Sequence, residues 1–185
     1  MAFGTVSGAI KDFDMKSKKI VRTQAKRHKK SITSLYSQGK YLISCSSEDN
    51  LIIVYDYSKQ EEYREVHLLG AEVLEGDLPC TVILFKDLTA EYLLIGSVKG
   101  QIYIYDLNNK CFGENSLGFK SKIIQIKAMS QSDKVSGSFN IFTALAQGGQ
   151  LKVFRINERL EFSELCKELQ KDMCHNTNPN PKPGF

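Results

Sequence analysis

Hydrophobic residues recur in one short pattern at four places along the chain. Each copy has an aliphatic residue, two spacer positions and an aromatic residue, and an Asp follows in three of the four. The copies are Ile10–Asp14, Ile52–Asp56, Ile102–Asp106 and Leu151–Arg155. Their last positions are separated by 42, 50 and 49 residues. A nearly fixed spacing of this size indicates a repeat architecture, in which similar units stack on one another.

A second apolar run precedes each copy and ends in turn residues. Two such runs joined by a short polar turn are typical of a β-hairpin. The turn residues are Ser7-Gly8, Asn50, Lys99-Gly100 and Gly148-Gly149. We therefore predict four hairpins with two-residue turns, in which Gly or Asn takes the positive φ that such a turn needs.

Further strands flank these hairpins. An apolar strand is expected before each of the last three hairpins, at residues 31–37, 79–85 and 122–129. A more polar segment follows each of the first three, at residues 18–27, 61–69 and 110–119. Four strands in each repeat predict the blades of a β-propeller. The first blade begins at its second strand, and the blades are expected at about residues 1–27, 28–70, 79–120 and 121–158.

One segment resembles a complete WD repeat. It consists of His28, Ile32 and Leu35, followed by Leu42–Asp56. His28 lies four residues before the aliphatic residue of its first strand, and Asp49 lies three residues before Ile52, as in that family. Tyr55-Asp56 stands where the family usually has Trp-Asp. The resemblance covers about residues 2–158 and implies an all-β, WD-repeat β-propeller fold.

The chain departs from the family pattern in its polar residues. It contains no Trp, so the family's buried network of His, Ser or Thr, Asp and Trp is expected in the second blade only. There it would use His28, Ser44 or Ser46, and Asp49, with Tyr55 in place of the indole. Ser7, Lys99 and Gly148 take the position of the turn Asp in the other blades, which we expect to be held by apolar packing.

The number of repeats is also unusual. About three and a half blades make an incomplete ring, whereas propellers close with four to eight blades and WD propellers usually with about seven. Either the chain is a fragment of a longer protein, which is the favoured interpretation, or another chain completes its ring. Uncovered strand edges and apolar faces predict that the isolated chain self-associates.

The C-terminal part ends the repeat pattern. Residues 159–174 are expected to form a short helix, because Phe162, Leu165, Leu169 and Met173 have helical spacing and Ser163 suits its N-cap. The alternative is the outer strand of the last blade. Residues 175–185 are rich in Pro and Asn and are expected to be disordered.

Composition gives a broad class. The chain is 42% hydrophobic and 25% charged, as in soluble globular proteins. It has no apolar run long enough to span a membrane and no signal peptide, so an intracellular location is expected, either nuclear, nucleolar or cytoplasmic. Its five Cys are widely spaced without a CxxC pair, so no metal site is predicted. Cys45 and Cys80 lie in apolar strands and are expected to be buried and reduced.

Catalysis is not expected. The three His residues are His28, which the repeat explains, His67 in a polar outer strand, and His175 in the tail. No nucleophile, base and orienting acid converge in the pattern, and no phosphate-binding loop is present. We therefore predict a protein that is not an enzyme and has no cofactor and no small-molecule substrate.

Charge is strongly segregated. Residues 15–47 contain no Asp or Glu and hold nine of the chain's 25 Lys and Arg residues. The nine are Lys16, Lys18, Lys19, Arg22, Lys26, Arg27, Lys29, Lys30 and Lys40. Lysines that protect an edge strand from aggregation would explain the segment 16–30. The alternatives are contact with RNA phosphates or an acidic protein, and a nuclear localisation signal.

Three functions remain open. The first is a non-catalytic scaffold that binds proteins in a multi-subunit complex. The resemblance implies that its partners bind where Lys29, Lys30, Glu48, Asn50 and Lys99 should lie. The second is a subunit of a nuclear ribonucleoprotein, such as a ribosome-biogenesis particle, in which Lys26, Arg27, Lys29 and Lys30 contact RNA. The third is a substrate adaptor of a ubiquitin ligase.

Overall fold

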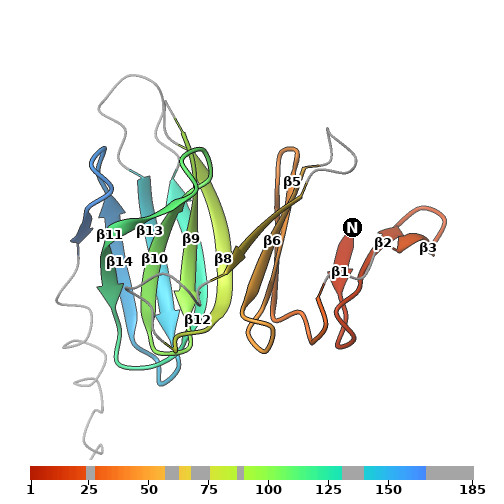
Figure 1. The fold of residues 1–185 in the computed structure, drawn as a ribbon, viewed down its shortest axis with the longest axis horizontal. Coiled ribbons are helices and arrows are strands. Elements are labelled where there is room, and N and C mark those ends of the chain that lie inside the picture. The colour runs from red at the N-terminus through yellow and green to blue at the C-terminus, as the bar shows by residue number, and fades with distance from the viewer. Residues whose placement is uncertain (24–27, 57–62, 68–75, 87–89, 131–139, 166–185) are drawn as a thin grey trace, which may run out of the picture.

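The fold is an array of four antiparallel sheets that follow one another in chain order (Figure 1). The computed structural model describes residues 1–23, 28–56, 63–67, 76–86, 90–130 and 140–165. In Figure 1 the N-terminal sheet lies at the right and the last sheet at the left. This arrangement confirms the all-β fold of propeller-like blades that the repeat predicts. Among the described residues, no helix is long and apolar enough to cross a membrane.

The first two sheets come from the N-terminal third of the chain. The first sheet has three strands, in the order β1 (Ala2–Gly4), β2 (Ile10–Asp14) and β3 (Lys19–Thr23). The second has four, in the order β4 (Ser34–Gln38), β5 (Tyr41–Ser46), β6 (Leu51–Asp56) and β7 (Tyr63–His67). The first sheet therefore begins at its second strand, as predicted, because β1 and β2 are the equivalents of β5 and β6.

The last two sheets repeat the four-stranded arrangement. The third has the order β8 (Pro79–Lys86), β9 (Glu91–Ser97), β10 (Gln101–Asp106) and β11 (Cys111–Gly118). The fourth has the order β12 (Ile123–Ser130), β13 (Asn140–Ala146), β14 (Leu151–Ile156) and β15 (Phe162–Glu164). In every sheet, strands that are consecutive in the sequence are also neighbours in space.

The same turn closes the central hairpin of all four sheets. The N–H of its fourth residue donates to the C=O of its first, from Gly8 to Thr5, Asn50 to Ser47, Gly100 to Ser97 and Gly149 to Ala146, at 3.1–3.3 Å. These fourth residues have φ of 83°, 52°, 86° and 85°. The positive φ is as predicted, but the two-residue turn length is wrong. The loop between paired strand positions has three residues in the first, third and fourth sheets (6–8, 98–100 and 147–149) and four in the second (47–50), because a left-handed residue follows the reverse turn before strand pairing resumes.

Apolar residues fill the two joints between the last three sheets. Between the second and third sheets lie Ile43, Ile52, Val54, Val82, Leu84, Leu93, Ile95 and Tyr103. Between the third and fourth lie Ile83, Phe85, Tyr92, Leu94, Ile102, Ile104, Ile126, Phe142, Ala144, Phe154 and Ile156. The third sheet is thus buried on both faces. This burial explains why β8 is a continuous apolar run rather than an alternating one.

The first strand of each sheet contacts the preceding sheet. Strand β8 packs against β4 and β5, and β12 packs against β8 and β9. The first sheet meets the second less closely, and a cavity of about 300 Å³ lies between them, beside Met1, Asp12 and Leu35. The first and third sheets each approach the next sheet closely at a glycine. A Cβ added to Gly4 would lie 2.7 Å from a side-chain atom of Ile32, and a Cβ added to Gly96 would lie 2.7 Å from a side-chain atom of Ile123.

The last described strand decides between the two C-terminal interpretations. Phe162–Glu164 form β15, which pairs with β14, so these residues are the outer strand of the fourth sheet. The predicted helix does not start at Ser163, because the ring of Phe162 packs against that of Phe154 with centroids 5.7 Å apart. The rest of that prediction, together with the tail 175–185, lies outside the described residues.

Alanine substitutions in the shared turn separate the cost of positive φ from the cost of close packing. Gly149→Ala should lower the free energy of unfolding by roughly 1–2 kcal/mol, the cost of a left-handed alanine, because nothing lies within 4 Å of its added Cβ. Gly8→Ala should cost about 1–3 kcal/mol more, because its Cβ would lie 2.2 Å from the carbonyl oxygen of His28. Urea unfolding measures both, and equal losses would contradict the close approach.

Candidate functional site

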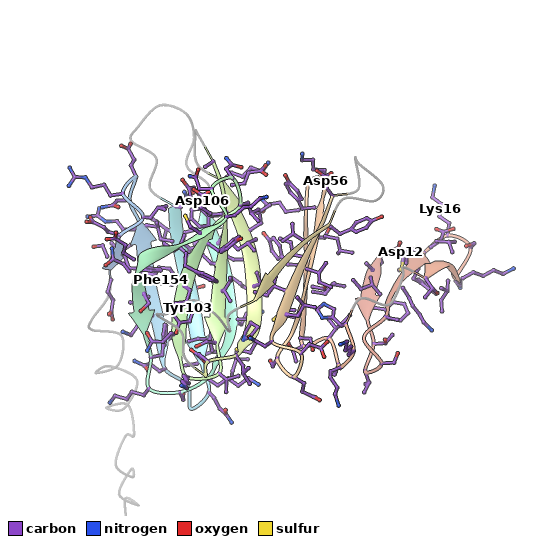
Figure 2. All side chains as sticks on the ribbon, in the orientation of Figure 1. Asp12, Lys16, Asp56, Tyr103, Asp106 and Phe154 are labelled. Carbon is purple, nitrogen blue, oxygen red and sulfur yellow. The ribbon has the colours of Figure 1, made fainter. Side chains whose placement is uncertain are left out.

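The hairpin turns and the loops before each first strand meet at one end of the sheets, the lower end in Figure 1. We call this end the turn face. It consists of turns 5–8, 47–50, 97–100 and 146–149 and loops 28–33, 76–78 and 119–122. Opposite it lie Asp56 and Asp106, which close their repeats at the other end of the sheets (Figure 2).

Hydrogen bonds tie the turn face together from the first sheet to the fourth. Within a sheet, the N–H of Thr33 donates to Cys45 O (2.8 Å), that of Val98 to Leu78 O (2.9 Å), and that of Gln147 to Lys122 O (2.7 Å). Between sheets, three bonds continue the line. They run from Ile32 N to Thr5 O (3.2 Å), from Ser47 Oγ to Pro79 O (2.5 Å) and from Phe119 N to Gly100 O (2.7 Å). The loops are therefore held in fixed positions by backbone groups and the Ser47 hydroxyl.

His28 lies at the centre of a polar cluster in the second sheet. Its side chain is 1% exposed, and Nε2 is 2.8 Å from the hydroxyl of Ser44. Its Nδ1 lies 3.5 Å from Asp49 Oδ2. The same oxygen accepts the N–H groups of Lys29 (2.7 Å) and Lys30 (3.1 Å). One carboxylate thereby joins the turn 47–50 to the loop that carries the two exposed lysines.

The other two predicted members of this cluster lie elsewhere on the sheet. Ser46 is fully buried, and its hydroxyl has no hydrogen-bond partner among the described residues, so Ser44 is the serine that bonds to His28. Tyr55 is half-buried on β6, where it pairs with Leu42 of β5. A role for Tyr55 in place of the indole stays a prediction.

The third sheet has a polar cluster that the sequence pattern did not predict. Asp77 is 2% exposed, and its Oδ1 accepts the N–H groups of Leu78 (2.9 Å) and Lys99 (3.0 Å). Its Oδ2 accepts the hydroxyl of Tyr103 at 2.9 Å. Burial, together with this carboxylate, raises the pKa of Tyr103 well above its usual range, which keeps the hydroxyl a donor.

Asp77 adds polar contacts to the apolar packing that is expected to hold the third sheet. In the second sheet, Asp49 is on the turn and accepts N–H groups of the loop. In the third sheet, Asp77 is on the loop and accepts the N–H of Lys99 on the turn. The sequence pattern did not predict a role for Asp77, because the family has its Asp at the turn, where this sheet has Lys99. The available signal was an isolated Asp directly before a strongly apolar strand.

The predicted partner surface is largely exposed on the turn face. Lys29, Lys30, Glu48 and Lys99 are all exposed. Asn50 was expected among them and is not, because its side chain is 4% exposed. The reason is its position, since a Cβ at the equivalent Gly8 or Gly100 would meet the backbone of the following loop rather than solvent. Lys26 and Arg27 lie outside the described residues.

The basic stretch extends along the first sheet rather than forming one cluster. Lys16, Lys18 and Lys19 are exposed at the turn that leads into β3. Figure 2 places Lys16 toward the end opposite the turn face. Lys29 and Lys30, by contrast, are on the turn face itself. The strand between them, β3, is an edge strand of its sheet.

The thiols are placed as small apolar residues. Cys45 and Cys80 are buried, and burial raises the pKa of both to about 12, so neither forms a thiolate at neutral pH. Cys111 is exposed. Within the described part of the chain, no three His, Cys, Asp or Glu side chains gather where they would hold a metal ion.

Replacement of His28 by Ala should destabilise the protein. The change removes the partner of a buried serine hydroxyl, which costs on the order of 1–3 kcal/mol. The control is Lys29→Ala, because Lys29 is exposed and binds Asp49 through its backbone N–H, which the substitution keeps. Thermal melts compare the two variants with the parent chain. Equal midpoints for all three proteins would show that the cluster contributes nothing to stability.

Comparisons with known proteins identify the fold. No protein-family model and no curated protein matches the sequence. Three solved structures are similar, at 18%, 13% and 13% sequence identity. They are the computationally designed Ika4 protein (TM-score 0.57, 84% of each chain covered), Sqt1 of Saccharomyces cerevisiae (TM-score 0.63, 85% of this chain) and U3-55K (TM-score 0.62, 88% of this chain). The chain spans 40% of the length of the Sqt1 chain and 47% of the U3-55K chain. The matches show four antiparallel sheets that correspond to part of a WD-repeat propeller.

Proposed function

We propose that the chain is a non-catalytic scaffold that binds partner proteins within a multi-subunit complex. The observation that carries this proposal is the turn face. Seven turns and loops from four sheets are joined there by hydrogen bonds, five between backbone groups and one from the Ser47 hydroxyl, so a partner would meet a surface that needs little ordering on binding. A surface that is already ordered favours association, because less conformational entropy is lost.

The composition of the turn face indicates the kind of partner. Its exposed charges are mostly positive, with Lys29, Lys30, Lys99 and Lys120 against Glu48. Two aliphatic side chains accompany them, Val6 at 83% exposure and Val98 at 37%. Exposed lysines beside isolated apolar side chains suit an acidic protein surface that contributes some apolar contact.

Charge reversal on the turn face tests the scaffold function. K29E/K30E/K99E should reduce binding of captured partner proteins at least tenfold, because like charges would then face an acidic surface. The control is K16E/K18E/K110E, which makes the same charge change with exposed lysines off the turn face. Both variants and the parent chain are used for affinity capture from nuclease-treated extract, with quantitative mass spectrometry. Equal capture by the two variants would contradict the turn face as the binding surface.

A second function is favoured by the basic stretch. We infer that Lys26, Arg27, Lys29 and Lys30 contact RNA phosphates, as in a nuclear ribonucleoprotein or ribosome-biogenesis subunit. The support is a surface of exposed cations without an acidic residue between positions 15 and 47. Few aromatic side chains lie within the stretch to stack on bases, so binding would be electrostatic and largely independent of sequence. A ubiquitin-ligase adaptor role rests on the fold alone.

RNA binding is tested by its dependence on salt. Each phosphate contact on a single strand contributes roughly −0.7 to the slope of log affinity against log salt, so four contacts give about −3. K26A/R27A/K29A/K30A should remove most of that slope. The matched control, K99A/K120A/K127A/R159A, removes the same residue types from other exposed sites and should leave the slope unchanged. Equal slopes for the two variants would place the RNA surface elsewhere. Lack of binding at low salt would exclude this function.

A further inference from the structure

The shared turn lets equivalent positions be compared from sheet to sheet. The turns of the third and fourth sheets begin at residues 97 and 146, an offset of 49. On the third sheet, Tyr92, Leu94, Ile102 and Ile104 form the face that the fourth sheet covers, and none of them is more than 6% exposed. We call this kind of face the leading face of a sheet.

The leading face of the fourth sheet is uncovered, and it is mainly apolar in the central hairpin and polar along β12, where Lys127 pairs with Thr143 and Gln125 with Leu145. The equivalent positions hold Ile141, Thr143, Leu151 and Val153, and Leu145 pairs with Leu151 beside them. Leu151 is 42% exposed, whereas its equivalent Ile102 is 0% exposed. Among the residues that the structure describes, no further sheet packs on this face. It is therefore one half of a sheet-to-sheet joint.

The first sheet carries the other half of such a joint. In the fourth sheet, the trailing face that meets the third sheet consists of Phe142, Ala144, Phe154 and Ile156. The equivalent positions in the first sheet, read through turns 5–8 and 146–149, are Met1, Phe3, Phe13 and Met15. Met1 is 78% exposed and Met15 65% exposed. Phe3 and Phe13 are half-buried, so this trailing face is also apolar and uncovered.

A lysine on the trailing face is compatible with a joint. Lys11 of the first sheet takes the position of Lys152 in the fourth. Lys152 lies in the chain's own joint with its ammonium 5.1 Å from the centroid of the Phe119 ring, and it pairs with Glu164 at 3.1 Å. The stem of a lysine packs on apolar surface while its charge reaches a polar partner.

We propose that two copies of this chain join head to tail, with the leading face of each fourth sheet covering the trailing face of the partner's first sheet. Both faces occur on every copy, and together they hold the equivalents of the second-strand and third-strand residues of the joint between the third and fourth sheets. The first-strand residues of that joint, Ile123 and Ile126 of β12, have no equivalent in the three-stranded first sheet. Two such joints, related by a twofold axis, close a ring of eight sheets, within the range of known propellers. The proposal does not depend on the scaffold or RNA function.

Two glutamate substitutions at already exposed positions test the joint without disturbing the core. Sedimentation of the full chain at micromolar concentration should give a dimer of the 20.9 kDa chain. L151E on the leading face and M15E on the trailing face should each weaken dimerisation at least tenfold. The control is V98E, because Val98 is an aliphatic residue of similar exposure to Leu151, 37% against 42%, and lies on neither face. Circular dichroism melts confirm that all variants fold.

Mixing the two variants tests the head-to-tail geometry. A mixture of L151E and M15E restores one unaltered joint, between the first sheet of L151E and the fourth sheet of M15E. Native mass spectrometry should therefore show more heterodimer than either homodimer. A monomeric parent chain would overturn the proposal, as would loss of the dimer in L151E alone, which would indicate that fourth sheets pair with each other. Open assemblies that grow with concentration would overturn the closed two-copy ring.

Discussion

Burial of one sheet face against the next is the interaction on which this structure depends. The third sheet alternates Leu93 and Ile95 on one face with Leu94 and Ile104 on the other, and all four are at most 1% exposed. A sheet that is apolar on both faces has to be covered on both, since each fully buried aliphatic side chain contributes roughly 1.5–3 kcal/mol. The order of the sheets and the contacts of β8 and β12 follow from this requirement. The end faces of the first and fourth sheets do not meet it among the described residues.

The turn face shows how the polar groups between packed sheets are satisfied. Where a hairpin turn meets a loop, backbone N–H groups that no strand pairs with need acceptors. Asp49 supplies the acceptor from the turn in the second sheet, and Asp77 supplies it from the loop in the third. In the fourth sheet the side chain of Gln150 accepts the N–H of Lys120 at 3.0 Å. The requirement is for an acceptor at this contact, and different residue types on either segment meet it.

Because different residues can supply the acceptor, the sequence alone predicts only part of the site. The repeating pattern of aliphatic and aromatic residues was sufficient to predict the four hairpins, because burial determines which strand positions are apolar. His28 and Asp49 were found because both match a known spacing. Asp77 was missed, because an acceptor on the loop satisfies the same amides without matching that spacing. Asn50 was misplaced on the surface for a similar reason, since a polar residue in a turn was read without its left-handed φ. At Phe162–Glu164, pairing with β14 and packing of Phe162 on Phe154 give a strand where the apolar spacing favoured the start of a helix.

The surfaces assigned to assembly and to partner binding are physically separate. The two apolar end faces are broad sides of sheets, whereas the turn face is formed by the ends of their strands. Joining of two copies would therefore leave Lys29, Lys30 and Lys99 exposed. It would also bring two turn faces into one ring, so that each partner site occurs twice. The basic strand β3 is the outer edge of the first sheet, and Lys19 and Arg22 on it oppose pairing with a further strand whether or not they contact phosphate. Edge protection and RNA binding by this stretch are therefore compatible, and the lysines can serve both.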